Sequence, residues 1–190
     1  MTSLGRLLLA QVRAIGSRNA CLPAREVPGG PWTVLGQRTY RTGASGSTSE
    51  VVERARAVHS VTSLRAYRDA GRADLFVQVV EFASAGDARV AVDELRALPR
   101  SVPHAKGVSD VGPLRTASRP EVAGADRTEA AEQAFVLDGE HARTLTLWCT
   151  MGPFVVVAGL GGRAEVVRWS QLSGIVEAQL AALSRDRAAG

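Results

Sequence analysis

Residues 143–160 read RTLTLWCTMGPFVVVAGL, and this stretch decides the fold. In the first half, successive side chains are expected to point to opposite faces of a β-strand. One face then carries Leu145, Leu147 and Cys149, and the other carries Thr144, Thr146 and Trp148. Its second half, Phe154 to Leu160, is a short apolar run typical of a buried strand. Because only a Gly-Pro link separates the halves, we expect two strands paired as a hairpin.

Further strands are expected upstream of this hairpin. Val61 to Tyr67 and Leu75 to Phe82 are rich in β-branched and aromatic residues, and a Gly-containing link joins them. These two segments are therefore predicted to be antiparallel neighbours. Trp32 to Tyr40 is expected to form a first strand, and Gln133 to Leu137 a strand that an Asp-Gly turn connects to the next one.

The helical patterns are fewer. Apolar residues recur at helical spacing from Ala88 to Leu98, and Ser84 followed by Asp87 resembles a capping arrangement in front of them. A long amphipathic helix is expected from Val166 to Leu183. Ser49 is expected to cap a short helix that reaches Val58 and carries two acids in its first turn, where the helix dipole favours them.

The order of these elements predicts the fold class. Strands, a helix, strands and a second helix follow one another, with a long loop over residues 100–127 that contains one short strand near Leu114. Hairpin-length links favour an α+β fold, an antiparallel sheet with helices packed on one face. The same order admits two strand-strand-helix halves, although no residue-level repeat accompanies it.

The composition argues against nucleic acid as a partner. Of the 23 basic residues Lys106 is the only lysine, and the formal net charge is +4. The arginines are interspersed with acids from Glu50 to Asp186 and aromatic residues make up only 5% of the chain, whereas a nucleic-acid binder gathers its cations on one face beside stacking aromatics. We therefore expect a protein or a small ligand as partner.

The amino terminus differs from the rest of the chain. Residues 1–22 are expected to form an amphipathic extension, and residues 23–190 a single domain that starts at a Pro- and Gly-rich break. Leu4, Leu8, Val12 and Ile15 share one side of a helical wheel. With four arginines and no acid before Glu26, this segment has the composition of an organellar transit peptide, whereas its apolar run is too short for a secretory signal.

No stretch reaches the roughly 20 apolar residues that a membrane-spanning helix needs, so no transmembrane segment is expected. An ordinary helix packed on the domain remains the alternative interpretation of the amphipathic segment. Cys21 lacks the apolar residue that a lipoprotein cysteine needs before it, so no lipidation is predicted.

A glycine motif follows the last expected strand. Gly159, Gly161 and Ala164 fit a Gly-x-Gly-x-x-Ala phosphate-binding turn between a strand and a helix. A dinucleotide fold needs a second parallel strand after that helix, and only the terminal helix and a polar tail follow here. We therefore interpret Gly159, Gly161 and Gly162 as a flexible strand-to-helix turn that binds no phosphate, and no cofactor is predicted.

No catalytic or metal-binding residue is predicted. His59, His104 and His141 lie in different segments without the spacing of metal ligands. No Gly-x-Ser-x-Gly elbow marks a nucleophilic serine. The two cysteines, Cys21 and Cys149, are either free thiols or one disulfide, because sequence alone does not show whether they approach.

Three phrases carry a resemblance to a known group of proteins. They are CLPAREVPGGPW at residues 21–32, VVEFASAGDA at 79–88 and VSDVG at 108–112. In this order they resemble poorly characterised actinobacterial cell-envelope domains of the lipoprotein and sensor type, over about residues 21–186. The resemblance implies a sheet with packed helices that binds ligands or partners outside the membrane, without shared catalytic residues. The missing export signal departs from that group and leaves the compartment open.

The leading hypothesis is therefore a non-enzymatic, sensor-like domain that binds a ligand or a partner. A second hypothesis is a small α+β protein that dimerises through its sheet, with a pocket for enzymatic or ligand-binding use. A third is an assembly subunit that docks through its amphipathic amino terminus.

Overall fold

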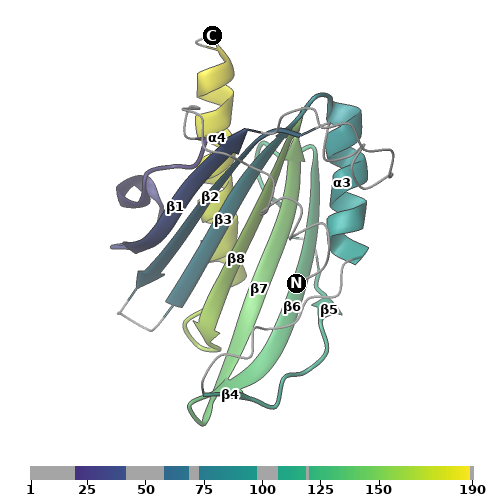
Figure 1. Cartoon of the computed structure of the whole chain (residues 1–190). Helices are drawn as coiled ribbons and strands as arrows, with labels where there is room; N and C mark the ends of the chain where they lie inside the picture. The colour runs from purple at the N-terminus through teal and green to yellow at the C-terminus, as the bar shows by residue number, and fades with distance from the viewer. Residues whose placement is uncertain (1–19, 42–57, 69–72, 98–106, 119, 189–190) are drawn as a thin grey trace.

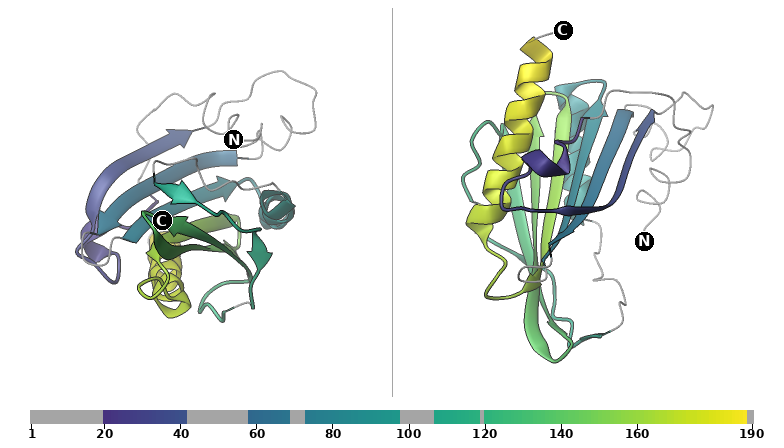
Figure 2. Two further views of the ribbon diagram at one scale, coloured as in Figure 1. Left: turned by 90° about the horizontal axis from the view of Figure 1, so that it is seen from below. Right: turned by 90° about the vertical axis from the view of Figure 1, so that its left-hand side faces the viewer.

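The computed structural model describes residues 20–41, 58–68, 73–97, 107–118 and 120–188. Its elements are η1 (Ala24–Glu26), β1 (Thr33–Arg41), β2 (Val58–Arg68), β3 (Ala73–Phe82), α3 (Ala85–Ala97), β4 (Val108–Ser109), β5 (Arg115–Thr116), β6 (Arg127–Leu137), β7 (Glu140–Met151), β8 (Phe154–Arg163) and α4 (Trp169–Ala188). One curled sheet dominates the molecule (Figures 1 and 2). The helix expected from Ser49 lies outside the described residues, except that its last residue, Val58, begins β2.

The sheet is antiparallel throughout its described strands. Its order is β1-β2-β3-β8-β7-β6-β4, and β5 pairs with β6. The predicted antiparallel pairs β2–β3 and β7–β8 are both confirmed. Asp138 and Gly139 join β6 to β7 with φ values of 50° and 82°, the conformation of a tight hairpin turn. The chain is thus an antiparallel sheet with helices, as the order of its elements predicts.

Several boundaries differ from the predicted ones. β6 starts at Arg127 rather than Gln133, and two short strands, β4 and β5, replace the single one expected near Leu114. β8 runs to Arg163 and α4 begins at Trp169, so the predicted start of the last helix at Val166 is wrong. Ser84 caps α3 as expected: its Oγ accepts the Asp87 N–H at 3.1 Å and donates to the Asp87 carboxylate at 2.6 Å.

The two helices lie on opposite faces of the sheet, so the prediction that both pack on one face is wrong. Leu147 of β7 belongs to the core that contains the apolar residues of α4, whereas the next residue, Trp148, belongs to the core that contains those of α3. Val155, Val156 and Val157 of β8 are exposed by 0%, 0% and 3%. Three consecutive buried residues need cover on both faces, because successive side chains of a strand point in opposite directions.

The core on the α4 face also contains residues from before the first strand. Cys21, Leu22, Val27 and Trp32 are buried there. Trp32 donates its indole N–H to the Pro28 carbonyl at 3.1 Å, and the guanidinium of Arg68 stands 5.2 Å from the centre of its ring. The segment before β1 is therefore packed against the sheet.

Gln179 of α4 ties this segment to the helix, and we call this pair of hydrogen bonds the Gln179 clasp. Its Oε1 accepts the Leu22 N–H at 2.9 Å, and its Nε2 donates to the Ala20 carbonyl at 2.7 Å. Residues 1–19 lie outside the described residues, so the division of the chain at Pro23 stays a prediction. The clasp places Ala20, Cys21 and Leu22 with the domain and favours a boundary before them.

Replacing Gln179 by alanine should destabilise the domain. Gln179 is 1% exposed, and its loss leaves a buried N–H and a buried carbonyl without partners, at about 1–3 kcal/mol each. We expect the free energy of unfolding in urea to fall by about 3 kcal/mol. Gln171→Ala, on the same helix at a half-buried site, is the matched control and should change it by less than about 1 kcal/mol. Equal losses in the two variants would contradict the role of the clasp.

Candidate binding trough on the α3 face

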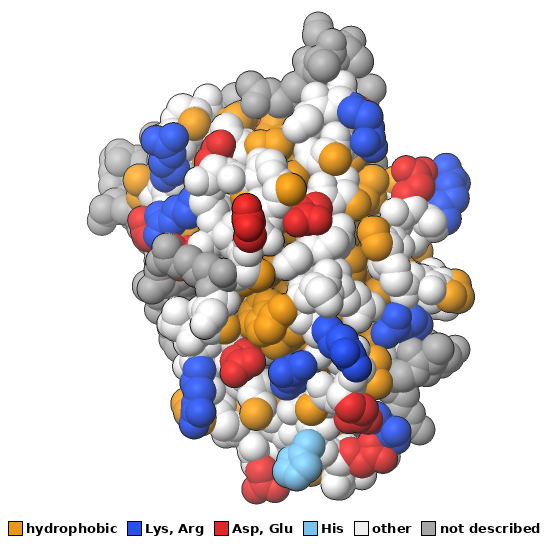
Figure 3. Space-filling view, turned by 180° about the vertical axis from the view of Figure 1, so that it is seen from behind, with side chains coloured by type: hydrophobic (Ala, Val, Ile, Leu, Met, Phe, Trp, Pro, Cys, Tyr) orange, Lys and Arg blue, Asp and Glu red, His pale blue; other side chains and the backbone are white. Residues whose placement is uncertain are grey.

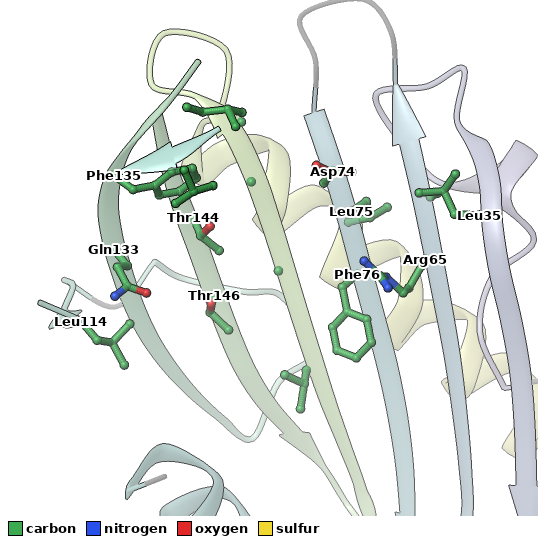
Figure 4. A pocket seen from close by; sticks show the side chains of 17 residues that line it. Leu35, Arg65, Asp74, Leu75, Phe76, Leu114, Gln133, Phe135, Thr144 and Thr146 are labelled. Atoms are coloured by element: carbon green, nitrogen blue, oxygen red, sulfur yellow. The ribbon is translucent and has the colours of Figure 1, made fainter. Parts of the chain in front are cut away.

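An open cavity of about 410 Å³ lies on the α3 face of the sheet, and we call it the trough (Figure 4). Its volume is within the range of small-molecule sites. Every strand of the main sheet order contributes to it. The lining residues are Leu35, Arg65, Ala66, Asp74, Leu75, Phe76, Val108, Leu114, Gln133, Phe135, Leu137, Thr144, Thr146, Val157, Gly159, Gly161 and Gly162.

The glycines of β8 form the floor of the trough. On the α3 face, β8 presents Val155 and Val157 and then Gly159 and Gly161; the valines pack against the core under α3. Where the glycines follow, β8 itself carries no side chain above the sheet, although the Thr144 hydroxyl oxygen stands 3.3 Å from a Cβ built at Gly161. A Cβ built at Gly159 would meet nothing closer than the Leu145 carbonyl oxygen at 3.9 Å. These glycines are strand residues, and their interpretation as a strand-to-helix turn is wrong.

Polar groups accompany the apolar walls at the middle of the trough. Thr144 and Thr146 of β7 project into it beside Gln133 of β6 (Figure 4). Gln133 donates its amide N–H to the Gly112 carbonyl at 2.9 Å, which fixes the segment before β5 against β6. Both threonines line the trough; Thr144 is partly exposed and Thr146 is buried.

Two opposite charges lie on the wall formed by β2 and β3. Burial raises the pKa of the Asp74 carboxyl above its usual range, and the charge of Arg65 opposes that shift. Among the described ion pairs none joins these two side chains. A donor and an acceptor are therefore both available on this wall (Figure 4).

Arg127 connects α3 to a buried carboxylate of the sheet, away from the floor of the trough. Arg127 of β6 contacts Glu129 at 2.9 Å and Asp93 of α3 at 2.6 Å. The Glu129 side chain is 1% exposed, whereas that of Asp93 is 60% exposed. Hydrogen bonds to Asp93 and then Glu129 raise the pKa of Arg127, so this guanidinium stays charged. Its role is structural, because it neutralises a carboxylate under the helix.

The cysteines are both free and buried. The Cys21 thiol donates to the carbonyls of Thr62 in β2 and Val77 in β3, whereas the Cys149 thiol contacts Thr128 in β6. β8 lies between β3 and β7, so the two thiols are held over different strands and do not form a disulfide. Burial raises the pKa of Cys21 to about 12 and that of Cys149 to about 11.

The structure does not bring the histidines together. His59 lies in β2, His141 lies exposed at the start of β7, and His104 is outside the described residues. Over the ranges that the structure describes, no group of His, Cys, Asp and Glu is arranged to hold a metal ion. None of the helices in those ranges is both long and apolar enough to cross a membrane.

Charges of both signs are interspersed on the face opposite the trough. Figure 3 shows Lys or Arg beside Asp or Glu across the α4 side, with apolar atoms between them. A mixed pattern of this kind matches the expectation from the sequence for this face.

Comparison with known proteins places the fold but not the function. No family model and no curated protein matches the chain. The extracellular domain of PknH from Mycobacterium tuberculosis has a similar fold, with a TM-score of 0.57 and 11% identity over 87% of this chain and 93% of that one. An uncharacterized protein from Mycobacterium smegmatis, the ortholog of Rv0999, gives a TM-score of 0.42 at 11% identity over 80% of this chain and 90% of that one. This TM-score is too low to indicate a shared fold. The likeness to PknH supports the fold that the resemblance to actinobacterial domains implies, a sheet with packed helices.

The trough was not predicted from the sequence. Its walls come from residues as distant along the chain as Leu35 and Leu137, which only the strand order brings together. One feature of the sequence does indicate the trough. On the strand face that carries Val155 and Val157, the next two residues are Gly159 and Gly161, which have no side chains. A glycine pair at a spacing of two marks either a close backbone approach or an open floor.

The thiols should be unreactive in the folded protein. A thiol reacts as its thiolate, and with pKa values of about 12 and 11 both cysteines stay protonated at neutral pH. We expect the intact mass after treatment with iodoacetamide to show no modification of the native protein and two modifications of the urea-unfolded protein. Rapid labelling of either cysteine without denaturant would contradict their burial.

Replacing Arg127 by methionine should destabilise the domain far more than removing its exposed partner. Arg127→Met leaves the buried Glu129 carboxylate without this cation, at about 3–5 kcal/mol. Asp93→Asn removes an exposed contact that contributes about 1 kcal/mol or less. The free energies of unfolding of the two variants measure the difference. Similar losses in both variants would show that the buried Glu129 carboxylate does not need the charge of Arg127.

Proposed function

We propose that the chain is a non-enzymatic binding domain of the sensor type, which holds a small, largely apolar molecule in the trough on its α3 face. The observation that carries this proposal is the glycine floor of β8, which opens the sheet surface between apolar walls. Protein interiors are otherwise close-packed, and a strand face left bare in this way is unusual. Gly159 and Gly161 are both partly exposed.

The lining supports a binding role. Phe76 and Phe135 stand on opposite walls, and the aliphatic side chains of Leu114 and Val157 lie between them and the core under α3. Few polar groups interrupt this surface, which is the composition of sites that bind small molecules through apolar area and orient them through a few hydrogen bonds. The hydroxyls of Thr144 and Thr146 are suited to the second task.

The rigidity of the site supports the same proposal. The floor consists of backbone paired on both sides, since Gly159 stands opposite Phe76 of β3 and Thr146 of β7. A preformed surface loses little conformational entropy when a ligand binds. The likeness in fold to the extracellular domain of PknH supports a location outside the membrane, where a domain of this class would meet its ligand.

Filling the trough from its floor should abolish binding. A leucine at Gly159 projects into open space, because a Cβ there has no neighbour closer than 3.9 Å. We expect the wild-type protein to bind anilinonaphthalene sulfonate saturably, with a rise in its fluorescence, and Gly159→Leu to weaken this binding by at least about 10-fold, roughly 1.4 kcal/mol. The thermal midpoint should stay within a few degrees.

Gly174→Leu is the matched control. Gly174 lies in α4 on the opposite face of the sheet, it does not line the trough, and a Cβ there meets nothing within 4 Å. This variant should bind the dye as the wild type does. Because the dye also binds partly folded proteins, near-ultraviolet circular dichroism of each variant must match the wild type. Unchanged dye binding by a folded Gly159→Leu would refute the proposed site.

A further inference from the structure

The trough has two chemically different ends along β8. Toward α3 its floor ends at Val157, which is 3% exposed and packs in the core under that helix, with Leu114 packed against the same core. This end is apolar and closed. At the other end Gly161 stands between Asp74 of β3 and Thr144 of β7. Polar groups therefore stand at this end of the glycine floor, where Asp74 is only partly buried, and Phe135 and Leu137 of β6 continue the trough beyond them.

The length of the floor fits one extended hydrocarbon chain. From Gly161 to Val157 the strand rises by about 13 Å, at about 3.3 Å a residue. An extended chain gains about 1.2 Å a bond, since three backbone bonds span 3.3–3.6 Å, so roughly 11 bonds cover that distance. Phe76 of β3 stands beside Gly159 on one side of this floor, and Thr144 and Thr146 of β7 line its other side, so the floor runs with the strand between them (Figure 4).

The charges at the polar end favour a neutral head group. Arg65 and Asp74 interact through their charges, and no ion pair between them occurs in the described part of the chain. An anionic head attracted by Arg65 is repelled by Asp74, and a cationic head attracted by Asp74 is repelled by Arg65, so neither charge gains a large net attraction here. A head group with hydroxyls meets neither penalty, because it donates to the carboxylate and accepts from the guanidinium and from Thr144.

We propose that the ligand is a neutral, hydroxylated single-chain amphiphile, such as a monoacylglycerol, whose chain lies along the β8 glycines toward Val157 and whose head meets Asp74, Arg65 and Thr144. This assignment rests on the proposed function, since it specifies the molecule that the trough holds.

Three compounds with a twelve-carbon chain test the head group. Monolauroylglycerol, laurate and dodecylammonium are titrated below their critical micelle concentrations against the protein loaded with anilinonaphthalene sulfonate. We expect monolauroylglycerol to displace the dye with a Kd at least about 10-fold lower than either charged compound. Asp74→Asn should improve the affinity for laurate several-fold, and Arg65→Gln should weaken it, because each removes one of the two opposing charges.

A series of monoacylglycerols tests the position of the chain. The Kd should fall by on the order of three-fold per added methylene up to about twelve carbons, as apolar area enters the trough, and change little beyond. Monooctanoylglycerol is then the weak member of the series. A Kd that does not depend on chain length would exclude the placement along β8.

The outcomes separate this inference from the proposed function. If a charged compound binds as tightly as monolauroylglycerol, the head-group assignment is wrong. If no amphiphile displaces the dye while Gly159→Leu still abolishes dye binding, the trough is a binding site and the ligand class is wrong. If Gly159→Leu leaves dye binding unchanged, both proposals fall.

Discussion

The pairing of β3 with β8 is the contact on which the rest of the structure depends. It joins two hairpins that are distant in the sequence, with Ala73 opposite Gly162 at one end and Glu81 opposite Phe154 at the other. Without it the β2–β3 hairpin and the β7–β8 hairpin would each have an open edge and one or two bare apolar faces. With it, a single sheet exists for α3 and α4 to cover from opposite sides.

The same pairing fixes the register that creates the trough. Phe76 and Asp74 are aligned with Gly159 and Gly161, so the bare part of β8 lies beside a wall that carries both an aromatic ring and a charge. A shift of one residue would turn every side chain of β8 to the other face. Leu160 would then leave the core on the α4 face and a glycine would take its place, which disfavours the shifted register.

Local patterns were sufficient to predict the hairpins and helices. The β2–β3 and β7–β8 pairs follow from strand chemistry and short links, and the cap at Ser84 from a four-residue motif. The prediction that both helices pack on one face was wrong. The apolar run Val155 to Val157 already requires cover on both faces of the sheet, because successive side chains of a strand point in opposite directions. The glycines were misassigned because a glycine cluster usually ends a strand, whereas paired strands on both sides keep Gly159 and Gly161 extended. The trough depends on register between distant segments, which periodicity does not contain.

The Gln179 clasp has a consequence for the order of folding. Its hydrogen bond to Leu22 spans 157 residues, and the residues it joins lie at the two ends of the described chain. During synthesis, the segment before β1 cannot reach its final partner until α4 has left the ribosome. The β2–β3 hairpin likewise cannot complete the sheet early, because β8, the partner of β3, is synthesised late. Until then, the early strands expose apolar faces that β8 and α4 will cover, a condition in which nascent chains aggregate or recruit chaperones. Contacts of such high sequence separation also predict slow refolding in isolation.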